Sequence, residues 1–317
     1  RGATLIAIDS ENPELLKDVD PERIKLASRT RLNATKHLMK YTMNDIVSWI
    51  VVAVPSVEWA EKVYPKLESQ TAVDKLWDDI FKFVRVEEGD SIHAWEEHLS
   101  TMARHADVLN EKQFVGLKYK SDNGTDLYVA MPKNHIWHAA NAKNSYGDRF
   151  IPNMPTEEVF TAHKFGTHGR LISTMPLSHN GKLIKDIDLT FEDGKVIKYS
   201  ASENEDALRD MLEMDEGALH LGEVALVPHD SPISNSNTIF FNTLFDENAS
   251  CHFALGKAYP TSVIGGADLA DDELESAGLN DSMIHVDFMV GSESLSIIGV
   301  EEDGMEFVIF KDGNFAF

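Results

Sequence analysis

The first third of the chain alternates apolar, strand-like runs with longer segments of helical composition. Residues 3–9 form a short apolar run that predicts a buried strand. Residues 49–55 are uniformly apolar and rich in β-branched side chains, as in strands that are covered on both faces. Between these runs, Pro21–Met43 is rich in Lys, Arg, Leu and Ala and predicts a helix. Strand, helix and strand at this spacing indicate an α/β unit with a parallel sheet.

Two further helices are expected in this region, at residues 72–84 and 91–110. In the second, apolar residues recur every three or four positions and form one stripe. Three histidines lie off this stripe and are expected to be exposed, namely His93, His98 and His105. A strand so close to the first residue has few partners, which suggests that further elements precede it. Residues 1–112 are therefore interpreted as an α/β domain that looks truncated at its N-terminal side.

The pattern changes from helical to alternating after about residue 113. Asn123-Gly124 and Asp193-Gly194 each separate two apolar-rich stretches, and Asp312-Gly313 does the same near the last residue. Such dipeptides favour the hairpin turns that need a positive φ. Two helices are expected among these strands, one at residues 203–215 and one that begins at Asp246. Residues 113–317 are therefore predicted to form an α+β, strand-rich domain, which carries all the candidate chemistry described below.

Composition limits the classes of function that fit the chain. Its 317 residues carry a formal net charge of −24, with a pI near 4.8, which disfavours binding to nucleic acid and to anionic membranes. No run approaches the ~18 apolar residues of a membrane span. The single cysteine, Cys251, excludes an internal disulfide framework, fits a reducing compartment and is interpreted as a packing residue.

Residues 243–259 are interpreted as a helix that begins with acidic residues. Asp246 suits the N-cap, and Glu247 would follow at the first helical position, where the helix dipole favours a carboxylate. On such a helix His252 and Tyr259 are seven residues apart, which is about two turns, and would share one face. A buried histidine is commonly a hydrogen-bonded core residue, so core and ligand roles for His252 both stay open at this point.

A second candidate site lies in residues 283–290, which are predicted to form a strand. Strand side chains alternate, so Met283, His285, Asp287 and Met289 would share one face, while the residues between them form an apolar face. Burying polar groups without partners costs about 1–3 kcal/mol each. A metal ion would satisfy His285 and Asp287 at once, although a His-x-Asp pair alone is a weak signal.

Acidic residues occupy two more apolar surroundings. Glu223 lies inside the apolar run 221–227, where it must be paired, bound to a metal or on an exposed face. Glu157 and Glu158 follow a proline turn, and adjacent glutamates are usually solvated. These residues alone leave ligand and exposed acid as alternatives.

Several long motifs, taken in order along the chain, resemble the thermophilic-type metalloaminopeptidases, the M29 family of peptidases. The motifs are residues 153–162, 221–228, 231–234, 243–249 with Cys251 and His252, and 278–282 leading into His285 and Asp287. The resemblance implies a cytoplasmic homodimer that removes single residues from the free N-termini of peptides, with two divalent ions, zinc or cobalt, as cofactors. It implies Tyr259 as a catalytic phenol. The metal ligands implied by the motifs are Glu157, Glu223, Glu247, His252, His285 and Asp287.

This set of donors is consistent with two ions. Four carboxylates and two imidazoles are too many for one catalytic zinc, which takes three protein ligands and water, but suit two ions that share a carboxylate. Glu223 or Asp287 is the expected bridge. The expected chemistry is attack by a metal-bridged hydroxide, with Glu158 as the base and Tyr259 donating a hydrogen bond to the oxyanion.

Two other readings explain part of the pattern. His252, His285 and Asp287 would suit a mononuclear iron oxygenase, although this leaves the glutamates without a role. A non-catalytic protein that binds metal or peptide is the alternative from another class. The sequence lacks the His-Glu-x-x-His motif of common zinc peptidases, a glycine-rich phosphate loop after a strand, and a Gly-x-Ser-x-Gly elbow.

Overall fold

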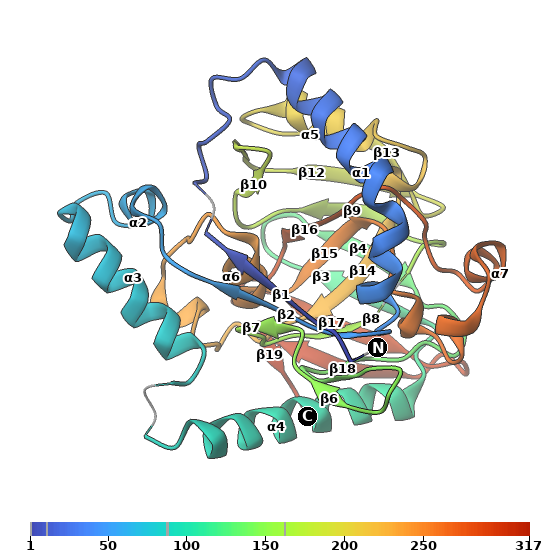
Figure 1. Ribbon diagram of the computed structural model, residues 1–317. Helices are drawn as coiled ribbons and strands as arrows, with labels where there is room; N and C mark the ends of the chain where they lie inside the picture. Colours follow the sequence, from blue (N-terminus) through green and yellow to red (C-terminus); the bar gives the residue numbers. More distant parts are fainter. Residues whose placement is uncertain (1, 11, 87–88, 162) are drawn as a thin grey trace.

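The computed structural model describes residues 2–10, 12–86, 89–161 and 163–317, and shows a mixed α and β protein (Figure 1). The N-terminal region forms a three-stranded parallel sheet in the order β1 (Thr4–Asp9), β2 (Ser48–Ala53) and β7 (Asn153–Met154). The helix α1 (Pro21–Met43) connects the first two strands, and the Asp20 side chain caps it by accepting from the Glu22 N–H. The predicted parallel α/β unit is therefore confirmed.

The expectation that residues 3–9 form a buried strand is wrong about its burial. β1 is the edge of the three-stranded sheet, and its apolar side chains face solvent. Leu5, Ile6 and Ile8 are 48%, 66% and 66% exposed, respectively. β2 is only half-buried along most of its length, not covered on both faces.

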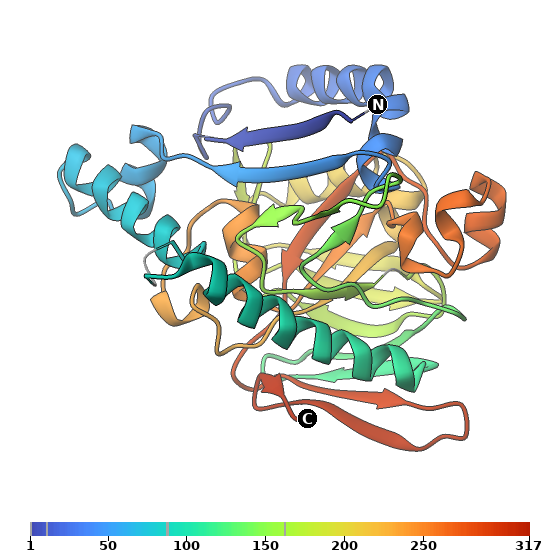
Figure 2. The same ribbon diagram turned by 60° about the horizontal axis from the view of Figure 1, so that its bottom comes forward.

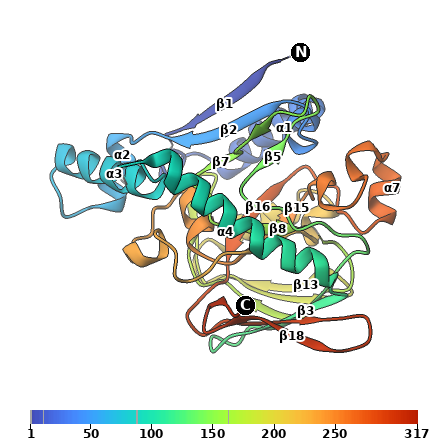
Figure 3. The same ribbon diagram turned by 90° about the horizontal axis from the view of Figure 1, so that it is seen from below.

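Three helices follow β2, namely α2 (Val57–Val63), α3 (Ser69–Phe83) and α4 (Ser91–Lys112), and confirm the predicted helical region. In Figures 2 and 3, α4 crosses the view between the β1–β2 pair and β18. Its residues Met102, Ala106 and Leu109 join the hydrophobic core of the strand-rich region. A second core combines residues of α2 and α3 with Phe240 and Phe245. Both cores therefore cross the boundary predicted at residue 112.

The strand-rich region contains an eight-stranded sheet in the order β13-β12-β9-β4-β3-β17-β18-β19, with antiparallel neighbours. The hairpins predicted at Asn123-Gly124, Asp193-Gly194 and Asp312-Gly313 are all present in it. The strands are β13 (Lys195–Ser200), β12 (Asp188–Glu192), β9 (His168–Ile172), β4 (Asp126–Ala130), β3 (Gly116–Lys120), β17 (Ser296–Val300), β18 (Glu306–Lys311) and β19 (Asn314–Phe315).

A four-stranded antiparallel sheet lies beside it, in the order β16 (His285–Met289), β15 (His252–Gly256), β14 (Leu221–Leu226) and β8 (Val159–Thr161). One face of this sheet is apolar and joins the main core. On that face the Phe253 ring lies 5.1 Å from the Tyr119 ring of β3, measured between centroids. The opposite face carries the polar residues of the candidate site.

The remaining α-helices and β-strands are short. They are β5 (Ala142–Lys143), β6 (Arg149–Phe150), β10 (Leu177–His179), β11 (Lys182–Ile184), α5 (Glu205–Leu212), α6 (Thr243–Asp246) and α7 (Asp271–Ser276). The helix expected at residues 203–215 is thus confirmed as α5. Among the described residues, no helix is long and apolar enough to cross a membrane.

The prediction of a long helix at residues 243–259 is wrong. α6 ends at Asp246, a single 3-10 turn covers Glu247–Ala249, and the chain then enters the strand β15. Asp246 is not an N-cap, because its carboxylate accepts from the N–H groups of Phe240 and Asn242 in the preceding loop. Strand pairing on both sides of β15 satisfies the backbone that the helix would have satisfied internally.

Candidate metal centre

The polar face of the four-stranded sheet places its functional side chains in register. Glu223 of β14 and Asp287 of β16 flank Ala254 of β15, each as its direct cross-strand partner. His252 shares the face of Ala254, because side chains two residues apart in a strand point the same way. Ala254 has only a methyl side chain, so the two carboxylates can face the space above it. The predicted alternation of residues 283–290 is therefore confirmed.

A glycine is the cross-strand partner of the second histidine. His285 lies opposite Gly256, which has a φ of +108°. A Cβ atom there would come within 2.2 Å of the Ile284 carbonyl oxygen, so no larger residue fits this position without displacing the backbone.

Both histidines turn Nε2 towards the carboxylates and Nδ1 towards backbone carbonyl oxygens. His252 Nδ1 lies 3.0 Å from the carbonyl oxygens of Glu247 and Ser250, and His285 Nδ1 lies 2.6 Å from that of Lys257. Because a carbonyl only accepts, each Nδ1 carries the hydrogen and donates it. A neutral ring then has its lone pair on Nε2, which is the arrangement of histidine ligands to metals.

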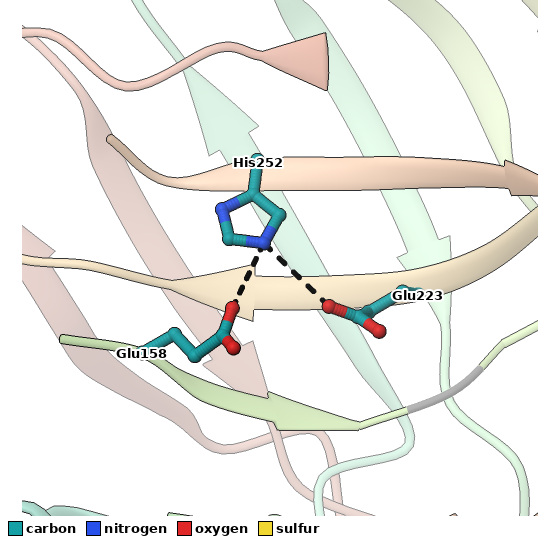
Figure 4. A group of neighbouring side chains, drawn as sticks. All are labelled: Glu158, Glu223 and His252. Atoms are coloured by element: carbon teal, nitrogen blue, oxygen red, sulfur yellow. Dashed lines mark ion pairs between the residues drawn. The ribbon is translucent and has the colours of Figure 1, made fainter. Parts of the chain in front are cut away.

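Glu223 lies between the two histidines. Its Oε1 is 3.5 Å from His252 Nε2, and its Oε2 is 3.5 Å from His285 Nε2. Figure 4 shows the first of these contacts, together with Glu158, whose Oε2 is 3.0 Å from the same His252 nitrogen. Asp287 Oδ1 completes the arrangement at 3.6 Å from His285 Nε2.

Glu247 approaches from the turn that precedes β15. Its ligand atoms lie with those of His252 and Asp287 within 4.8 Å of one another. Two more such groups overlap with this one: Glu158, Glu223 and His252, and Glu223, His285 and Asp287. The three groups share members, so the six side chains form one continuous cluster.

The electrostatics of this cluster reflect its burial and its charge. Burial, with the neighbouring carboxylates, raises the pKa of Glu223 to about 7 and that of Glu247 well above its usual range. Although burial opposes it, the carboxylates of Glu158 and Glu223 hold the pKa of His252 well above its usual value. Buried like charges disfavour one another's ionisation, and a bound cation relieves this cost.

The donors fit a bound metal. Among the described residues, His252 Nε2 and Asp287 Oδ1 are buried and make no hydrogen bond of good geometry, and the polar atoms nearest to them belong to the cluster itself. Mixed imidazole and carboxylate donors suit zinc and similar divalent ions. The cluster is therefore chemically suited to hold metal ions.

The two adjacent glutamates point in different directions. Glu158 joins the cluster, whereas Glu157 Oε1 lies 2.7 Å from Arg85 Nη2, in a buried ion pair that sequence reasoning did not anticipate. The predicted ligand Glu157 belongs to none of the three ligand groups. Glu158 and Phe160 are two residues apart and both line the site cavity, while Val159 lies in the core. This strand alternation at β8 is the sequence signal that distinguishes the two glutamates.

His98 contacts the same Arg85. The prediction that His98 is exposed is therefore wrong. Its Nε2 donates to the Thr156 carbonyl over 2.7 Å, which leaves Nδ1 to accept from Arg85 Nη2 over 3.0 Å. Burial, together with the charge of Arg85, lowers the pKa of His98 to about 4. His105 is also in contact, since its ring stacks on Phe315 at 3.9 Å.

Tyr259 lies beside the cluster, in the loop after β15. Its ring is 5.4 Å from that of His285 and 5.6 Å from that of Phe160, between centroids. Burial, with the carboxylates of Glu223 and Asp287, raises the pKa of Tyr259 well above its usual value. The phenol therefore keeps its proton at neutral pH and is able to donate a hydrogen bond.

A cavity of about 110 Å³ opens onto these groups. It is lined by the carboxylates of the cluster, by His285 and Tyr259, and by Trp49, Pro152 and Phe160. Asp45 also lines it, and its carboxylate accepts from Trp49 Nε1 over 3.2 Å. No pattern in the sequence had indicated Trp49 or Asp45 as site residues.

Comparison with known proteins gives a consistent result. The model of the thermophilic metalloprotease family M29 matches residues 1–315. Aminopeptidase 2 of Geobacillus stearothermophilus is 48% identical over 318 residues, which covers 100% of this chain and 77% of the relative. Aminopeptidase AmpS of Bacillus subtilis is 45% identical over 317 residues, with the same coverage.

A solved structure, wild-type AmpT from Thermus thermophilus, superimposes with a TM-score of 0.91 at 35% identity. The match covers 100% of this chain and 77% of that one. The sequence motifs and the fold thus agree with the family match, and the chain belongs to the M29 family of thermophilic metalloproteases.

Proposed function

We propose that the chain is a metal-dependent aminopeptidase that holds two divalent ions and hydrolyses the N-terminal residue of peptides. The relatives carry the name aminopeptidase, which supports the reaction class. The observation that carries the two-ion proposal is the position of Glu223. Its two oxygens face the Nε2 atoms of two different histidines, as a carboxylate shared by two ions would.

The ligands follow from the three groups. Glu158, Glu223 and His252 would hold one ion, and Glu223, His285 and Asp287 the other. Glu247, grouped with His252 and Asp287, would be a further ligand. In this proposal Glu158 takes the ligand role that the sequence motifs gave to Glu157, and is no longer the base. Zinc and cobalt are the proposed metals, because both accept imidazole and carboxylate donors.

When bound, the ions would polarise the peptide carbonyl and lower the pKa of water from 15.7 towards ~7, which supplies the nucleophile. Tyr259 lines the same cavity as the carboxylates of the cluster, and its protonated phenol would donate a hydrogen bond to the oxygen that becomes negative. The side chains of Trp49 and Phe160 line the cavity with apolar surface and would exclude water around the scissile bond of a bound peptide.

Two properties implied by the sequence motifs stay predictions. These are that the enzyme acts in the cytoplasm and that it is a homodimer. Light scattering on the purified chain at several concentrations would measure its mass, and a monomer at all concentrations would contradict the homodimer.

The mononuclear iron reading makes a different prediction about metal content. It uses His252, His285 and Asp287 and leaves Glu158 and Glu223 without a role, although both lie within 3.5 Å of His252 Nε2. Two ions per chain support the hydrolase, and a single redox-active iron supports the oxygenase.

The experiment that tests the proposal compares a free dipeptide with its N-acetylated twin. The protein is stripped of metal, reconstituted stepwise with Zn²⁺ or Co²⁺, and its metal content is counted in the same sample. Cleavage of the free peptide alone, restored as the second equivalent binds, is the expected result. Two bound ions without cleavage would contradict the aminopeptidase proposal and favour a binding protein, and absence of metal binding would contradict the ligand assignment.

A further inference from the structure

One fully buried amide side chain, that of Asn248, connects the two segments that carry Glu158 and Glu247. It is 0% exposed. Its Oδ1 accepts from the Glu157 N–H over 2.7 Å, although the two residues are 91 positions apart. Its Nδ2 donates to the Leu244 carbonyl over 2.9 Å and to Glu247 Oε1 over 3.4 Å.

The Glu157 end of this connection is held from the other side as well. The Glu157 carboxylate pairs with Arg85, and Arg85 Nη1 also donates to the Phe83 carbonyl over 3.2 Å. Glu157 is therefore fixed through its backbone N–H by Asn248 and through its carboxylate by Arg85. Glu158 is the next residue, so its backbone has little freedom to move relative to His252.

The Glu247 end is fixed by its neighbours in sequence. Asp246 accepts from two N–H groups of the preceding loop, and the Glu247 carbonyl accepts from His252 Nδ1. The side-chain oxygen of Glu247 is in turn contacted by Asn248. Two carboxylates from distant parts of the chain thus depend on the same amide for their placement.

We propose that Asn248 is a positioning residue that couples Glu158 to Glu247 and sets the affinity of the site for its metal ions. This inference rests on the proposed function, because it takes Glu158 and Glu247 as ligands. Groups that orient metal ligands typically contribute 10–100-fold to metal affinity. A residue that only filled space or satisfied backbone groups would affect stability and leave the affinity of the folded protein unchanged.

The test measures Zn²⁺ affinity by competition with a chromogenic chelator, alongside the thermal midpoint of the metal-free protein. We expect Asn248→Ala to lower the affinity by about 10–100-fold. We also expect KM for a dipeptide to stay near the wild-type value once Zn²⁺ is saturating. Asn248→Ser, whose hydroxyl is one atom shorter than the amide, is the second variant if Asn248→Ala does not fold, and the same loss is expected.

Asn110→Ala is the matched control. Asn110 makes the same kind of connection, since its Oδ1 accepts from the Trp137 N–H over 2.8 Å and its Nδ2 donates to the Trp137 carbonyl over 2.9 Å. It belongs to none of the ligand groups, and these two side-chain hydrogen bonds go to Trp137 rather than to a member of those groups. Its variant should lose thermal stability and keep the wild-type Zn²⁺ affinity.

Two outcomes would overturn the inference. One is wild-type Zn²⁺ affinity in the folded Asn248 variants. The other is an equal loss of affinity in Asn110→Ala, which would mean that affinity only follows stability. Failure of the proposed function has a different signature, because wild-type protein would then bind Zn²⁺ and leave free dipeptides uncleaved, while the comparison of affinities would still be informative.

Discussion

At the scale of single residues, two neighbouring glutamates of identical chemistry have different surroundings. Glu157 pairs with the guanidinium of Arg85, and Glu158 faces the imidazole of His252. Both are buried, with 7% and 6% of their surfaces exposed, so neither is the solvated acid that adjacent glutamates usually are. The chemistry of the side chain did not separate them, because only the direction in which each points decides its partner.

Exchange of each glutamate for glutamine should therefore affect metal binding differently. Glu158→Gln removes a charged donor from the His252 group, and we expect metal affinity to fall by at least tenfold, as for the loss of a ligand or its support. Glu157→Gln should lose stability, because Arg85 is left with a neutral partner, but its amide oxygen can still accept from Arg85 and hold Glu158 in place, so metal affinity should stay near the wild-type value. Calorimetric Zn²⁺ titration and urea unfolding measure the two effects. Loss of metal in Glu157→Gln alone would restore the ligand set that the sequence motifs implied.

The phenol of Tyr259 gives a second prediction at this scale. Tyr259→Phe keeps the ring between Phe160 and His285 and removes only the hydroxyl. Metal content should be unchanged. The value of kcat should fall roughly 10²–10³-fold, which corresponds to a loss of about 2.7–4 kcal/mol in transition-state stabilisation. Steady-state kinetics on a dipeptide, with metal counted in the same preparation, measures this change. A wild-type kcat would remove Tyr259 from the mechanism.

At the scale of elements, the site depends on the small residues between the ligands. Ala254 lies between Glu223 and Asp287, Ala225 lies opposite His252, and Gly256 lies opposite His285. The two alanines have only methyl side chains beside the polar groups on this face, and Gly256 allows close approach of the Ile284 backbone. The sheet therefore provides both the register of the ligands and the volume they enclose.

Enlarging one of these residues should close that volume without removing a ligand. Ala254→Val places two methyl groups between Glu223 and Asp287, and we expect a clear loss of Zn²⁺ affinity together with a cost of about 1–3 kcal/mol in stability. The control is Ala72→Val, at a buried position of α3 in the other hydrophobic core, which should lose stability alone. Isothermal titration and urea unfolding compare the two. Equal Zn²⁺ affinity in both variants would contradict the role given to Ala254.

Most elements could be predicted from the local pattern of apolar and polar residues. The main wrong prediction, the helix at residues 243–259, shows what this local pattern does not contain. Pro21–Met43 forms the predicted helix, and the strand at residues 283–290 shows the predicted alternation. Residues 243–259 did not form a helix, because β15 is apolar on one face and carries His252, Ala254 and Gly256 on the other. Acidic residues at its start suggested a cap, whereas they belong to a turn that delivers Glu247 to the cluster.

At the scale of the whole molecule, the site combines segments that are distant in sequence. Its candidate ligands come from the loop before β8, from β14, from the turn before β15, and from β15 and β16. The family motifs indicated five of the six clustered residues as ligands, and the expected hydrolytic chemistry gave Glu158 the role of a base. Arg85, Asn248 and Trp49 could not be found in this way, because their contacts exist only once distant segments pack together.

Buried histidines give a prediction for the stability of the whole fold. Burial lowers the pKa of His163 to about 3, below the usual value near 6.5. As the pH falls from about 6.5, the unfolded chain takes up a proton that the folded chain does not. Stability due to this residue is therefore lost on acidification, by up to about 1.4 kcal/mol per pH unit.

The variant His163→Gln removes this one titration. Relative to it, the wild type should lose free energy of unfolding as the pH is lowered from about 6.5 towards 4, because only the wild type has the buried imidazole. Urea unfolding of both proteins in the presence of a chelator, at half-unit pH steps, measures the difference. Parallel curves over this range would contradict the assignment of a neutral, buried His163.

The opposite orientations of Glu157 and Glu158 also matter for reading related sequences. Strand side chains alternate with a period of two, so a shift of one residue at β8 would turn Glu157 towards His252 and Glu158 towards Arg85. An alignment in which both columns contain glutamate would not reveal such a shift. In this chain the residue two positions after Glu158 is Phe160, which also lines the cavity, so the spacing between glutamate and aromatic residue is the feature to compare in a relative.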